Sequence, residues 1–583
     1  MYKYKILQSK LEELGVDAYI CFDADDHGSE YVSRHFKARD YFSGFTGSNG
    51  TLVVTKTEAK LWTDGRYFIQ ASEELLPGIE LMKEGEKGVK TVFEYLKSIK
   101  EQPKVAFSFR LASVAFVKTL QKCGVEAVSD ESLADALWED RPAREITPAW
   151  LLTNEEAGET QEEKIGRLRA AMAKEDAPYA LVASLDDAAW LLNMRGNDIA
   201  YNPVNYVYVL VGKEFVNLYA DEEKIAVLRP ELEARGITVK SYDEVYSDAE
   251  RIDGVTLIDE SKTNYALYEK LKYKKAAAVF PTTAMKAEKN STEIENIKKA
   301  HVIDGVAMVK FMRYLKENAG KEKMTEISVA DKLYEFRKQS EDFIELSFGT
   351  IAGYEEHGAI VHYEATEKTD APVYAKGLLL VDSGAQYRFG TTDVTRTFVL
   401  GEISAEAKTD FTLVLKGHID LAMAIFPVGT TGLSLDMLAR KPLYERGKNY
   451  RHGTGHGVGY LLNVHEGPQN ISMGGVRKSN IYPFRPGMVT SDEPGFYEEG
   501  KYGIRHENLL LCVKKNETEY GEFLGFEPLT LVPFDKEGID FDLLDDKEKE
   551  YLSNYHRRVY ETLAPYLDKE EEEFLRKITS EDK

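Results

Sequence analysis

Cysteine and long hydrophobic runs are scarce in this chain of 583 residues. The three cysteines, Cys21, Cys123 and Cys512, are scattered and form no CxxC pair, so neither a disulfide framework nor a thiolate zinc site is indicated. The chain has no apolar stretch of about 18 residues without a charged residue. Its charged N-terminal segment also lacks the apolar run of a secretion signal. We therefore expect a cytoplasmic protein without a membrane span.

Positive charge is also in deficit. The chain has 75 Lys and Arg against 99 Asp and Glu, which gives a formal net charge of −24. A chain this acidic repels a phosphate backbone, so we do not expect nucleic acid as the main partner. Apolar residues still make up 43% of the sequence, which is enough for sizeable cores and argues against global disorder.

The first half of the chain contains an internal repeat of helix, strand, aspartate pair and further strands. The first copy covers 4–64 with the pair Asp25-Asp26, and the second covers 165–221 with the pair Asp186-Asp187. The order and spacing predict two similar α/β domains in tandem. The alternative, that any two α/β units look alike at this level of detail, stays open.

Proline and polar residues interrupt the pattern at two places, and these predict three domains. We place them at 1–150, 151–287 and 288–583. A capping-box pattern, Thr292 with Glu295, predicts the start of the first helix of the third domain. That domain is rich in strand-like runs and ends in a charged helical extension, so we expect an α+β domain after two α/β domains.

Histidine is the other scarce residue, and its distribution is uneven. The sequence has only 11 histidines, and four of them fall in one C-terminal stretch: His452, His456, His465 and His506. The last 300 residues also carry acidic residues at predicted strand ends and turns: Asp382, Asp393, Glu493 and Glu507. A strand–turn–strand hairpin would bring the first two of these carboxylates together.

Buried carboxylates are costly unless a cation balances them. Four carboxylates and one imidazole suit two hard or borderline divalent ions, such as Mn²⁺, Co²⁺, Fe²⁺ or Zn²⁺. Two such ions about 3.5–4 Å apart can turn a bridging water into hydroxide at neutral pH, which is the chemistry of amide hydrolysis. The alternative is that each acidic residue is only a surface charge or caps a helix or turn. The residue types alone do not identify the metal.

Other familiar motifs are absent. The glycine-rich run 452–459 lacks the spacing and the Lys-Ser/Thr of a phosphate loop. The pair His465-Glu466 begins like HExxH, but position 469 is Gln469, so that zinc motif is not formed. No Gly-x-Ser-x-Gly nucleophile elbow is present.

A set of distinctive stretches occurs in a fixed order along the chain: 360–363, 381–387, 392–397, 452–459, 492–495 and 505–508, with 43–51, 62–68 and 190–196 in the N-terminal half. In order and spacing, these stretches resemble those of the pita-bread metallopeptidases (peptidase family M24), most closely the three-domain cytosolic Xaa-Pro aminopeptidases. The resemblance covers nearly the whole chain. It implies two tandem creatinase-like α/β domains followed by a pita-bread catalytic domain.

The resemblance also implies an activity. It is that of a metalloaminopeptidase that hydrolyses the bond between any N-terminal residue and a penultimate proline, with a hydroxide bridging two divalent ions. Mn²⁺ is the metal implied first, with Zn²⁺ or Co²⁺ as alternatives, and a homodimer is expected. The rival interpretations are a prolidase, which cleaves Xaa-Pro dipeptides only, and a non-catalytic binding or chaperone protein on the same fold.

Roles follow from the resemblance at matching positions only. The implied metal ligands are Asp382, Asp393, His456, Glu493 and Glu507. The implied catalytic residues are Glu493, which moves a proton, with His362 and His465. The implied substrate contacts are His362, His452, His465, Tyr497, Arg505 and, from the first domain, Arg66.

Two histidines remain outside this assignment. His506 stands between Arg505 and Glu507, and the alternation of side chains along a strand predicts that it points away from the metals. His357 either touches the rim of the cleft or caps a loop.

Overall fold

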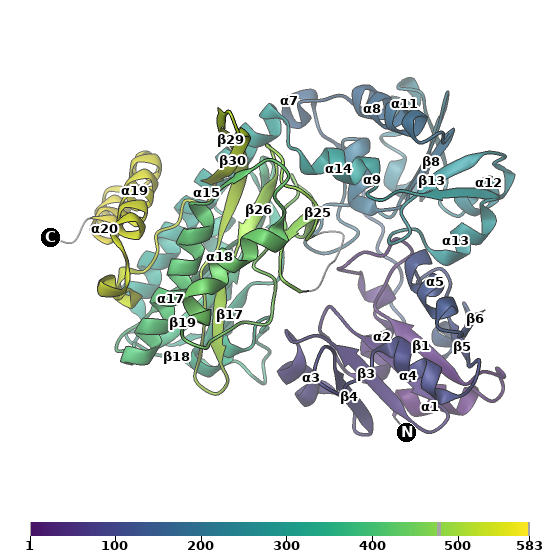
Figure 1. Cartoon of the computed structure of the whole chain (residues 1–583), viewed down its shortest axis with the longest axis horizontal. Coiled ribbons are helices and arrows are strands. Elements are labelled where there is room, and N and C mark those ends of the chain that lie inside the picture. The colour runs from purple at the N-terminus through teal and green to yellow at the C-terminus, as the bar shows by residue number, and fades with distance from the viewer. Residues whose placement is uncertain (1, 475–479, 581–583) are drawn as a thin grey trace. The chain divides into compact units, whose positions relative to one another are not determined.

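The computed structural model describes residues 2–474 and 480–580. The chain forms two compact units, Met1–Thr283 and Ala284–Lys583, whose elements are labelled in Figure 1. Across the described ranges, no helix combines the length and the apolar character needed to cross a membrane.

The first unit contains two six-stranded sheets with the same strand order. The first sheet runs β4 (Ile79–Lys83), β3 (Ala59–Thr63), β2 (Thr51–Thr55), β1 (Ala18–Phe22), β5 (Lys104–Phe107), β6 (Glu126–Ser129). The second runs β12 (Ile237–Ser241), β11 (Val216–Ala220), β10 (Tyr208–Gly212), β8 (Tyr179–Val182), β13 (Val255–Ile258), β14 (Tyr273–Ala276). Corresponding neighbours pair in the same sense: β3–β4 and β11–β12 are parallel, whereas β1–β2 and β8–β10 are antiparallel. The predicted repeat is therefore confirmed.

Helices connect the strands of both sheets. Those of the first half are α1 (Lys3–Lys10), α2 (Ala38–Ser43), α3 (Phe68–Glu74), α4 (Val92–Ile99), α5 (Val114–Lys122) and α6 (Leu133–Leu137). Those of the second half are α7 (Asn154–Ala157), α8 (Gln161–Lys174), α9 (Leu185–Leu191), α10 (Glu222–Ile225), α11 (Arg229–Ala234), α12 (Glu244–Arg251), α13 (Tyr265–Lys270) and α14 (Pro281–Ala287). The alternation of helix and strand is that of an α/β fold.

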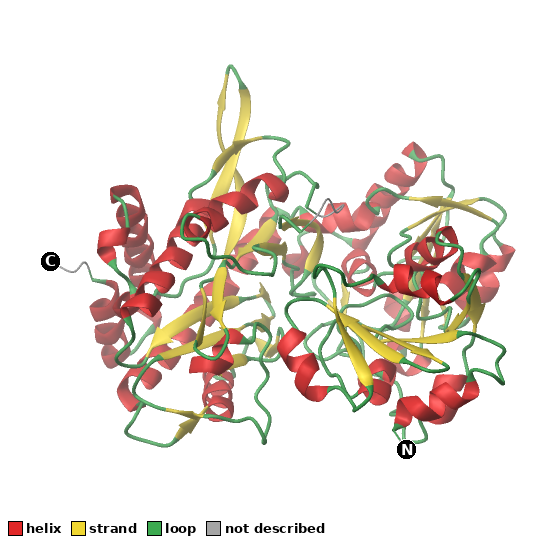
Figure 2. Ribbon diagram, turned by 60° about the horizontal axis from the view of Figure 1, so that its bottom comes forward, coloured by secondary structure: helices red, strands yellow, loops and turns green. Residues whose placement is uncertain are grey.

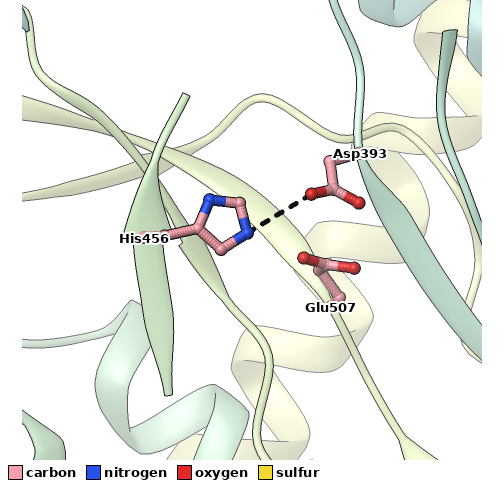
Figure 3. A group of neighbouring side chains, drawn as sticks. All are labelled: Asp393, His456 and Glu507. Atoms are coloured by element: carbon pink, nitrogen blue, oxygen red, sulfur yellow. Dashed lines mark ion pairs between the residues drawn. The ribbon is translucent and has the colours of Figure 1, made fainter. Parts of the chain in front are cut away.

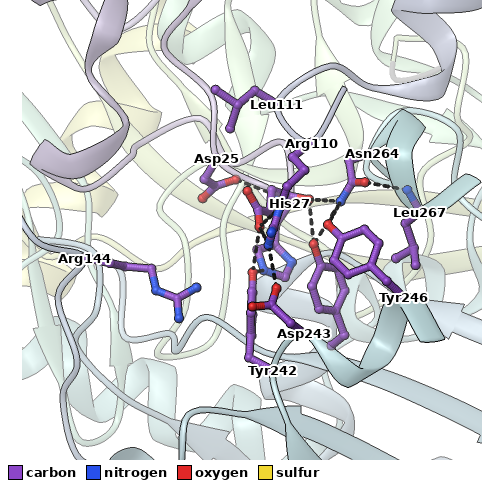
Figure 4. Close-up of polar contacts among 12 residues, drawn as sticks. Asp25, His27, Arg110, Leu111, Arg144, Tyr242, Asp243, Tyr246, Asn264 and Leu267 are labelled. Atoms are coloured by element: carbon purple, nitrogen blue, oxygen red, sulfur yellow. Dashed lines mark hydrogen bonds and ion pairs between the residues drawn. The ribbon is translucent and has the colours of Figure 1, made fainter. Parts of the chain in front are cut away.

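The first aspartate pair lies where the two halves of this unit meet, as Figure 4 shows. The backbone carbonyl of Asp26 accepts a hydrogen bond from Asn264 Nδ2 at 2.8 Å. His27 Nδ1 donates to the carbonyl of Ala183 at 2.6 Å, and its Nε2 accepts from the hydroxyl of Tyr242 at 2.7 Å. A loop of the first half is thus held by polar groups of the second.

The second aspartate pair anchors the start of α14, at the end of the second half of this unit. Asp187 Oδ2 accepts hydrogen bonds from the hydroxyls of Thr282 at 2.8 Å and Thr283 at 2.6 Å, both near the start of α14. The repeated aspartates therefore have a structural use in each copy.

The second unit combines antiparallel sheets with long helices, as Figure 2 shows by colour. Its six-stranded sheet runs β23 (Ile425–Pro427), β30 (Gly521–Pro528), β29 (Asn508–Thr518), β26 (Val489–Asp492), β24 (Gly455–Gly457), β25 (Glu466–Ile471). The smaller sheets are β17 (Ile351–Tyr354)-β19 (Leu378–Ser383)-β22 (Val394–Val399), β16 (Phe343–Leu346)-β20 (Ala385–Tyr387)-β21 (Gly390–Thr391), β27 (Gly495–Glu498)-β28 (Tyr502–Arg505) and β15 (Met324–Thr325)-β18 (Pro372–Val373). The helices are α15 (Ser291–Asn318), α16 (Glu326–Arg337), α17 (Ala405–Ala422), α18 (Gly432–Tyr444), α19 (Asp546–Leu563) and α20 (Lys569–Thr579). This is the expected α+β class.

The start of α15 differs from the prediction. Asn290 is the N-cap: its side chain accepts from the backbone N–H of Glu293 at 2.9 Å, and the Glu293 carboxylate accepts from the backbone N–H of Asn290 at 2.9 Å. The predicted box at Thr292 and Glu295 is wrong, because asparagine is among the strongest N-caps and its own reciprocal pair comes first along the chain.

Candidate metal centre

Three side chains from distant parts of the sequence converge in the second unit. The ligand-type atoms of Asp393, His456 and Glu507 all lie within 4.8 Å of one another (Figure 3). Asp393 immediately precedes β22, Glu507 immediately precedes β29, and His456 is the middle residue of β24. Strand ends thus bring two carboxylates and one imidazole to a single point.

Hydrogen bonds orient the imidazole of His456. Its Nδ1–H donates to the carbonyl of Gly457 at 3.0 Å, and its backbone N–H donates to Ser491 Oγ at 2.9 Å. Its Nε2 then faces Asp393 Oδ2 at 3.5 Å and Glu493 Oε1 at 3.4 Å. Fixing one ring nitrogen in this way is how metal-binding histidines commonly present the other.

The two other predicted ligands, Asp382 and Glu493, belong to strands of the same unit. Asp382 lies opposite Thr395 in the antiparallel β19–β22 pair, as the predicted hairpin requires. Its Oδ2 accepts from Arg505 Nη2 at 2.6 Å, whereas its buried Oδ1 has no hydrogen-bond partner among residues 2–474 and 480–580. Glu493 directly follows β26 and accepts from Ser491 Oγ at 3.3 Å.

The charges of this cluster perturb its own titration. Burial and the neighbouring Asp393 and Asp382 raise the pKa of Glu507 well above its ordinary value. Burial also raises the pKa of Asp382 and of Glu493. Burial alone would lower the pKa of His456, but its hydrogen bond to Asp393 and the charge of Glu493 raise it to about 9. The carboxylate shifts come first from burial and then from repulsion among the acids, and the shift of His456 comes from its carboxylate neighbours.

The donor set fits divalent cations. Carboxylates buried together are destabilised unless a cation balances them, and the free Oδ1 of Asp382 is a buried acceptor of the kind that a metal ion satisfies. Oxygen-rich sites with one imidazole nitrogen accept several divalent metals. The cluster is therefore a candidate metal centre.

Three of the predicted substrate contacts form a hydrogen-bonded chain beside Asp382. Arg505 Nη1 donates to the hydroxyl of Tyr497 at 2.7 Å, and that hydroxyl lies 2.8 Å from His452 Nε2. Because His452 Nδ1 lies 2.7 Å from the carbonyl of Gly453, Nδ1 carries the proton and Nε2 accepts from Tyr497. Burial raises the pKa of Tyr497 to about 12.

Two further predicted histidines lie near these groups. The ring of His465 meets that of His456 edge to face, with centroids 4.3 Å apart. His362 is half-buried and follows Val361, whose carbonyl accepts from Arg505 Nη2 at 3.4 Å. The catalytic roles of both histidines stay predictions.

Arg66 lies in the first unit. Its guanidinium pairs there with Asp64 at 2.8 Å. Its role as a substrate contact therefore also stays a prediction.

The two unassigned histidines serve the fold. His506 is fully buried and packs on Phe411, with centroids 4.3 Å apart, and on Phe534 at 5.7 Å. It points into an aromatic core, whereas the sequence predicted only that it points away from the metals. His357 Nδ1 lies 2.9 Å from the fully buried carboxylate of Glu326.

The prediction from sequence missed the hydroxyl groups that hold two of the carboxylates. Thr395 Oγ1 donates to Glu507 Oε2 at 2.7 Å, and Ser491 Oγ contacts Glu493. Strand periodicity carried a usable signal, because residues two apart in a strand share one face. Thr395 is two residues after Asp393, and Ser491 is two residues before Glu493.

Family models match nearly the whole chain. Residues 4–137 and 140–293 each match the Creatinase/Prolidase N-terminal domain. Residues 295–514 match metallopeptidase family M24, and residues 522–581 match the C-terminal region of peptidase M24.

Relatives match over their full length. A Sordaria macrospora protein named probable Xaa-Pro aminopeptidase P is 40% identical, with 96% of each chain covered. The Xaa-Pro aminopeptidase 1 of Dictyostelium discoideum is 36% identical, over 97% of this chain and 94% of its own. The crystal structure of X-prolyl aminopeptidase from Caenorhabditis elegans, described as a cytosolic enzyme with a di-nuclear active site, gives a TM-score of 0.94 at 34% identity, covering 99% of both chains. A prolidase from Pyrococcus horikoshii gives a TM-score of 0.51 at 26% identity, covering 64% of this chain and 99% of its own.

Two creatinase-type domains followed by a carboxylate-lined pita-bread domain define a metallopeptidase. The chain belongs to metallopeptidase family M24, and the S. macrospora and D. discoideum relatives that it matches along nearly their entire length are named Xaa-Pro aminopeptidases. The predicted family and fold class are thereby confirmed.

Proposed function

We propose that this protein is an aminopeptidase that releases the N-terminal residue from peptides whose second residue is proline. The observation that carries the proposal is likeness along the entire chain, both N-terminal domains included, to proteins named for that activity. The buried carboxylate–imidazole cluster supplies a site suited to it.

Two divalent ions are part of the proposal. The residues proposed to hold them are Asp382, Asp393, His456, Glu493 and Glu507. Mn²⁺ is proposed first, with Zn²⁺ or Co²⁺ as alternatives, and the di-nuclear description of the C. elegans relative supports the number. When bound, such ions polarise a carbonyl and lower the pKa of water.

Glu493 is proposed to move the proton. The bond before proline is a tertiary amide whose nitrogen carries no hydrogen, so this nitrogen must receive a proton when the bond breaks. The Glu493 carboxylate takes that proton from the attacking water and delivers it to the nitrogen.

The histidines are proposed to bind the reacting carbonyl and the proline. A ring N–H group of His362 stabilises the oxyanion as the carbonyl is attacked, and His465 is proposed as a further catalytic residue that also lines the cleft around the proline. His452 lies with Tyr497 and Arg505 in the chain beside Asp382 and is proposed to line the cleft around the proline. Arg66 is proposed as a further substrate contact from the first domain.

We propose further that the domains run 1–150, 151–287 and 288–583, and that the protein is a cytoplasmic homodimer. The description of the C. elegans relative as cytosolic supports the compartment. Light scattering coupled to size exclusion tests the dimer: a single species at the monomer mass would refute it.

A prolidase is the alternative enzyme. The prolidase from Pyrococcus horikoshii covers only 64% of this chain, which favours the aminopeptidase. Comparing kcat/KM for Xaa-Pro and Xaa-Pro-Yaa decides: faster turnover of the dipeptide favours a prolidase. Tight metal binding without turnover of either substrate would favour a non-catalytic binding protein.

A further inference from the structure

Directly behind the candidate metal centre lies a layer of buried polar side chains. Asp492 of β26 pairs across the sheet with Asn508 of β29, and each is the chain neighbour of a proposed ligand, Glu493 or Glu507. Neighbouring residues in an extended chain point to opposite sides, so Asp492 and Asn508 face away from the metal pocket. Both are fully buried.

His418 of α17 joins the backbone of Asp492 to the side chain of Asn508. Its Nδ1 lies 3.1 Å from the Asp492 carbonyl oxygen and 3.2 Å from Asp492 Oδ2. Its Nε2 lies 3.2 Å from Asn508 Nδ2. One tautomer satisfies both ends: Asn508 donates to Nε2, and Nδ1–H donates to Asp492.

Arg396 of β22 ties the same layer to the backbone of Glu507. Its Nη1 donates to the Glu507 carbonyl at 2.6 Å, and its Nη2 donates to Asn508 Oδ1 at 2.8 Å and to the Val532 carbonyl at 2.6 Å. The guanidinium is fully buried and lies 4.0 Å from the ring centre of Phe534. Within the described ranges, its hydrogen-bond partners are carbonyl, amide and hydroxyl oxygens rather than carboxylates.

The C-terminal helical extension reaches this arginine through Tyr555. Arg396 Nη2 has two N–H groups for three acceptors, so the Tyr555 hydroxyl, at 3.2 Å, shares one of them with Asn508 Oδ1 or the Val532 carbonyl, and it donates to the Val532 carbonyl at 2.9 Å. Tyr555 belongs to α19, which lies against α15 and α17 of the same unit (Figure 1). A hydroxyl from the end of the chain therefore fixes one side of the guanidinium that holds Glu507.

We propose that Tyr555 is a positioning residue which, through Arg396, fixes the backbone of Glu507 and so sets the metal affinity of the centre. This inference rests on the proposed function, since it needs Glu507 to be a ligand. Without the hydroxyl, Arg396 loses one of its anchors and its hold on the Glu507 carbonyl loosens. The C-terminal extension thereby acquires a functional task in addition to packing.

The test compares two tyrosines one helical turn apart. Tyr555→Phe removes the anchoring hydroxyl, whereas Tyr551→Phe removes a hydroxyl that has no hydrogen-bond partner in the described part of the chain. Mn²⁺ is titrated calorimetrically into metal-stripped protein, and release of Mn²⁺ to a chelator is timed. We expect Tyr555→Phe to weaken Mn²⁺ binding about 10-fold and speed its release, since outer supports of metal ligands typically contribute 10–100-fold. At saturating Mn²⁺ its kcat should recover, and Tyr551→Phe should match the unsubstituted protein throughout.

A second variant tests the same layer from the other end. His418→Asn keeps a donor for Asp492 but removes the acceptor for Asn508, so it should also weaken Mn²⁺ binding; it decides the matter if Tyr555→Phe does not fold. Unchanged Mn²⁺ affinity in both variants, with only a lower melting temperature, would overturn the inference. Absence of Mn²⁺ binding in the unsubstituted protein would instead overturn the proposed function, and the inference with it.

Discussion

Two buried clusters that combine aspartate, histidine, tyrosine and arginine, one in each unit, can be compared: the cluster around Asp26 and His27 and the candidate metal centre. In the first unit, Asp26 pairs with Arg110 at 2.6 Å, and both ring nitrogens of His27 bind neutral oxygens. In the second unit, the imidazole of His456 faces the carboxylates of Asp393 and Glu493. The two clusters contain nearly the same residue types, but the histidine of the first has neutral partners and the histidine of the second faces carboxylates.

The titration of the two histidines expresses this difference. Burial lowers the pKa of His27 to about 3, whereas hydrogen bonding to Asp393 and the charge of Glu493 raise the pKa of His456 to about 9 against the effect of burial. The first cluster carries its own balancing cation and works as an interdomain contact. The second has more negative than positive charge and suits added cations. Charge balance, more than residue type, separates a structural cluster from a candidate metal site.

The largest difference between the two clusters should appear in kcat when one carboxylate charge is removed from each. Glu507→Gln keeps the side-chain shape but removes a proposed ligand, so kcat on an Xaa-Pro-Yaa tripeptide should fall by at least about 10³-fold, or about 4 kcal/mol. Circular dichroism should show the fold retained. Asp25→Asn is the same chemical change in the first unit, and its kcat should stay within about twofold. More than a tenth of normal activity in Glu507→Gln would contradict the ligand assignment.

The second largest difference between the clusters should be in how much added Mn²⁺ stabilises the folded protein. A ligand that binds only the folded state at about 100 times its Kd stabilises that state by about 3 kcal/mol. Added Mn²⁺ should therefore raise the melting temperature of the metal-stripped protein in a thermal scan. Glu507→Gln should lose this shift and His27→Gln should keep it, whereas equal shifts in the two variants would place the metal elsewhere.

The pH dependence of stability should carry the signature of His27. Its pKa in the folded protein, about 3, lies below the ordinary 6.5, so the unfolded chain binds the proton first as the pH falls. The neutral His27 contributes its full share to the free energy of unfolding above about pH 6.5, and this share is lost as the pH falls towards 3. By pH 5 the loss is about 2 kcal/mol. Urea unfolding at pH 7.5 and pH 5 should show the unsubstituted protein losing that much more than His27→Gln. Equal losses of unfolding free energy in the two proteins would show that His27 does not cause this pH dependence.

The smallest effect is expected at His506. It is a chain neighbour of Glu507 but packs among aromatic rings, so His506→Phe should change the free energy of unfolding by about 1 kcal/mol. Its kcat and Mn²⁺ affinity should stay within about threefold. A large loss of Mn²⁺ binding would show that proximity in sequence, rather than side-chain direction, decides which histidines matter.

Much of the candidate site could be predicted because its signals are local. Asp382, Asp393, Glu493 and Glu507 stand at strand ends or turns, and turn residues and apolar runs mark such places in a sequence. The repeat in the first half was visible for the same reason. The start of α15 was misplaced because two capping patterns overlap, and only the structure shows that Asn290 forms the cap.

The supports of the site could not be predicted, since they join residues that only packing brings together. Arg396 and Tyr555 are 159 residues apart; elsewhere in the same unit, Lys289 is 177 residues from Glu466, with which it forms a fully buried pair at 2.6 Å. Neither pair has a sequence pattern of its own. Charge balance is equally invisible in a sequence, which is why the aspartates of the first unit could be located but not given a purpose.

The most direct test of the central claim is hydrolysis of an Xaa-Pro-Yaa tripeptide by metal-stripped protein during a titration with Mn²⁺. We expect no turnover before Mn²⁺ is added and full activity after about two equivalents, with the Xaa-Pro dipeptide cleaved much more slowly. Full activity in the stripped protein, or no activity at any Mn²⁺, Zn²⁺ or Co²⁺ concentration, would contradict the claim.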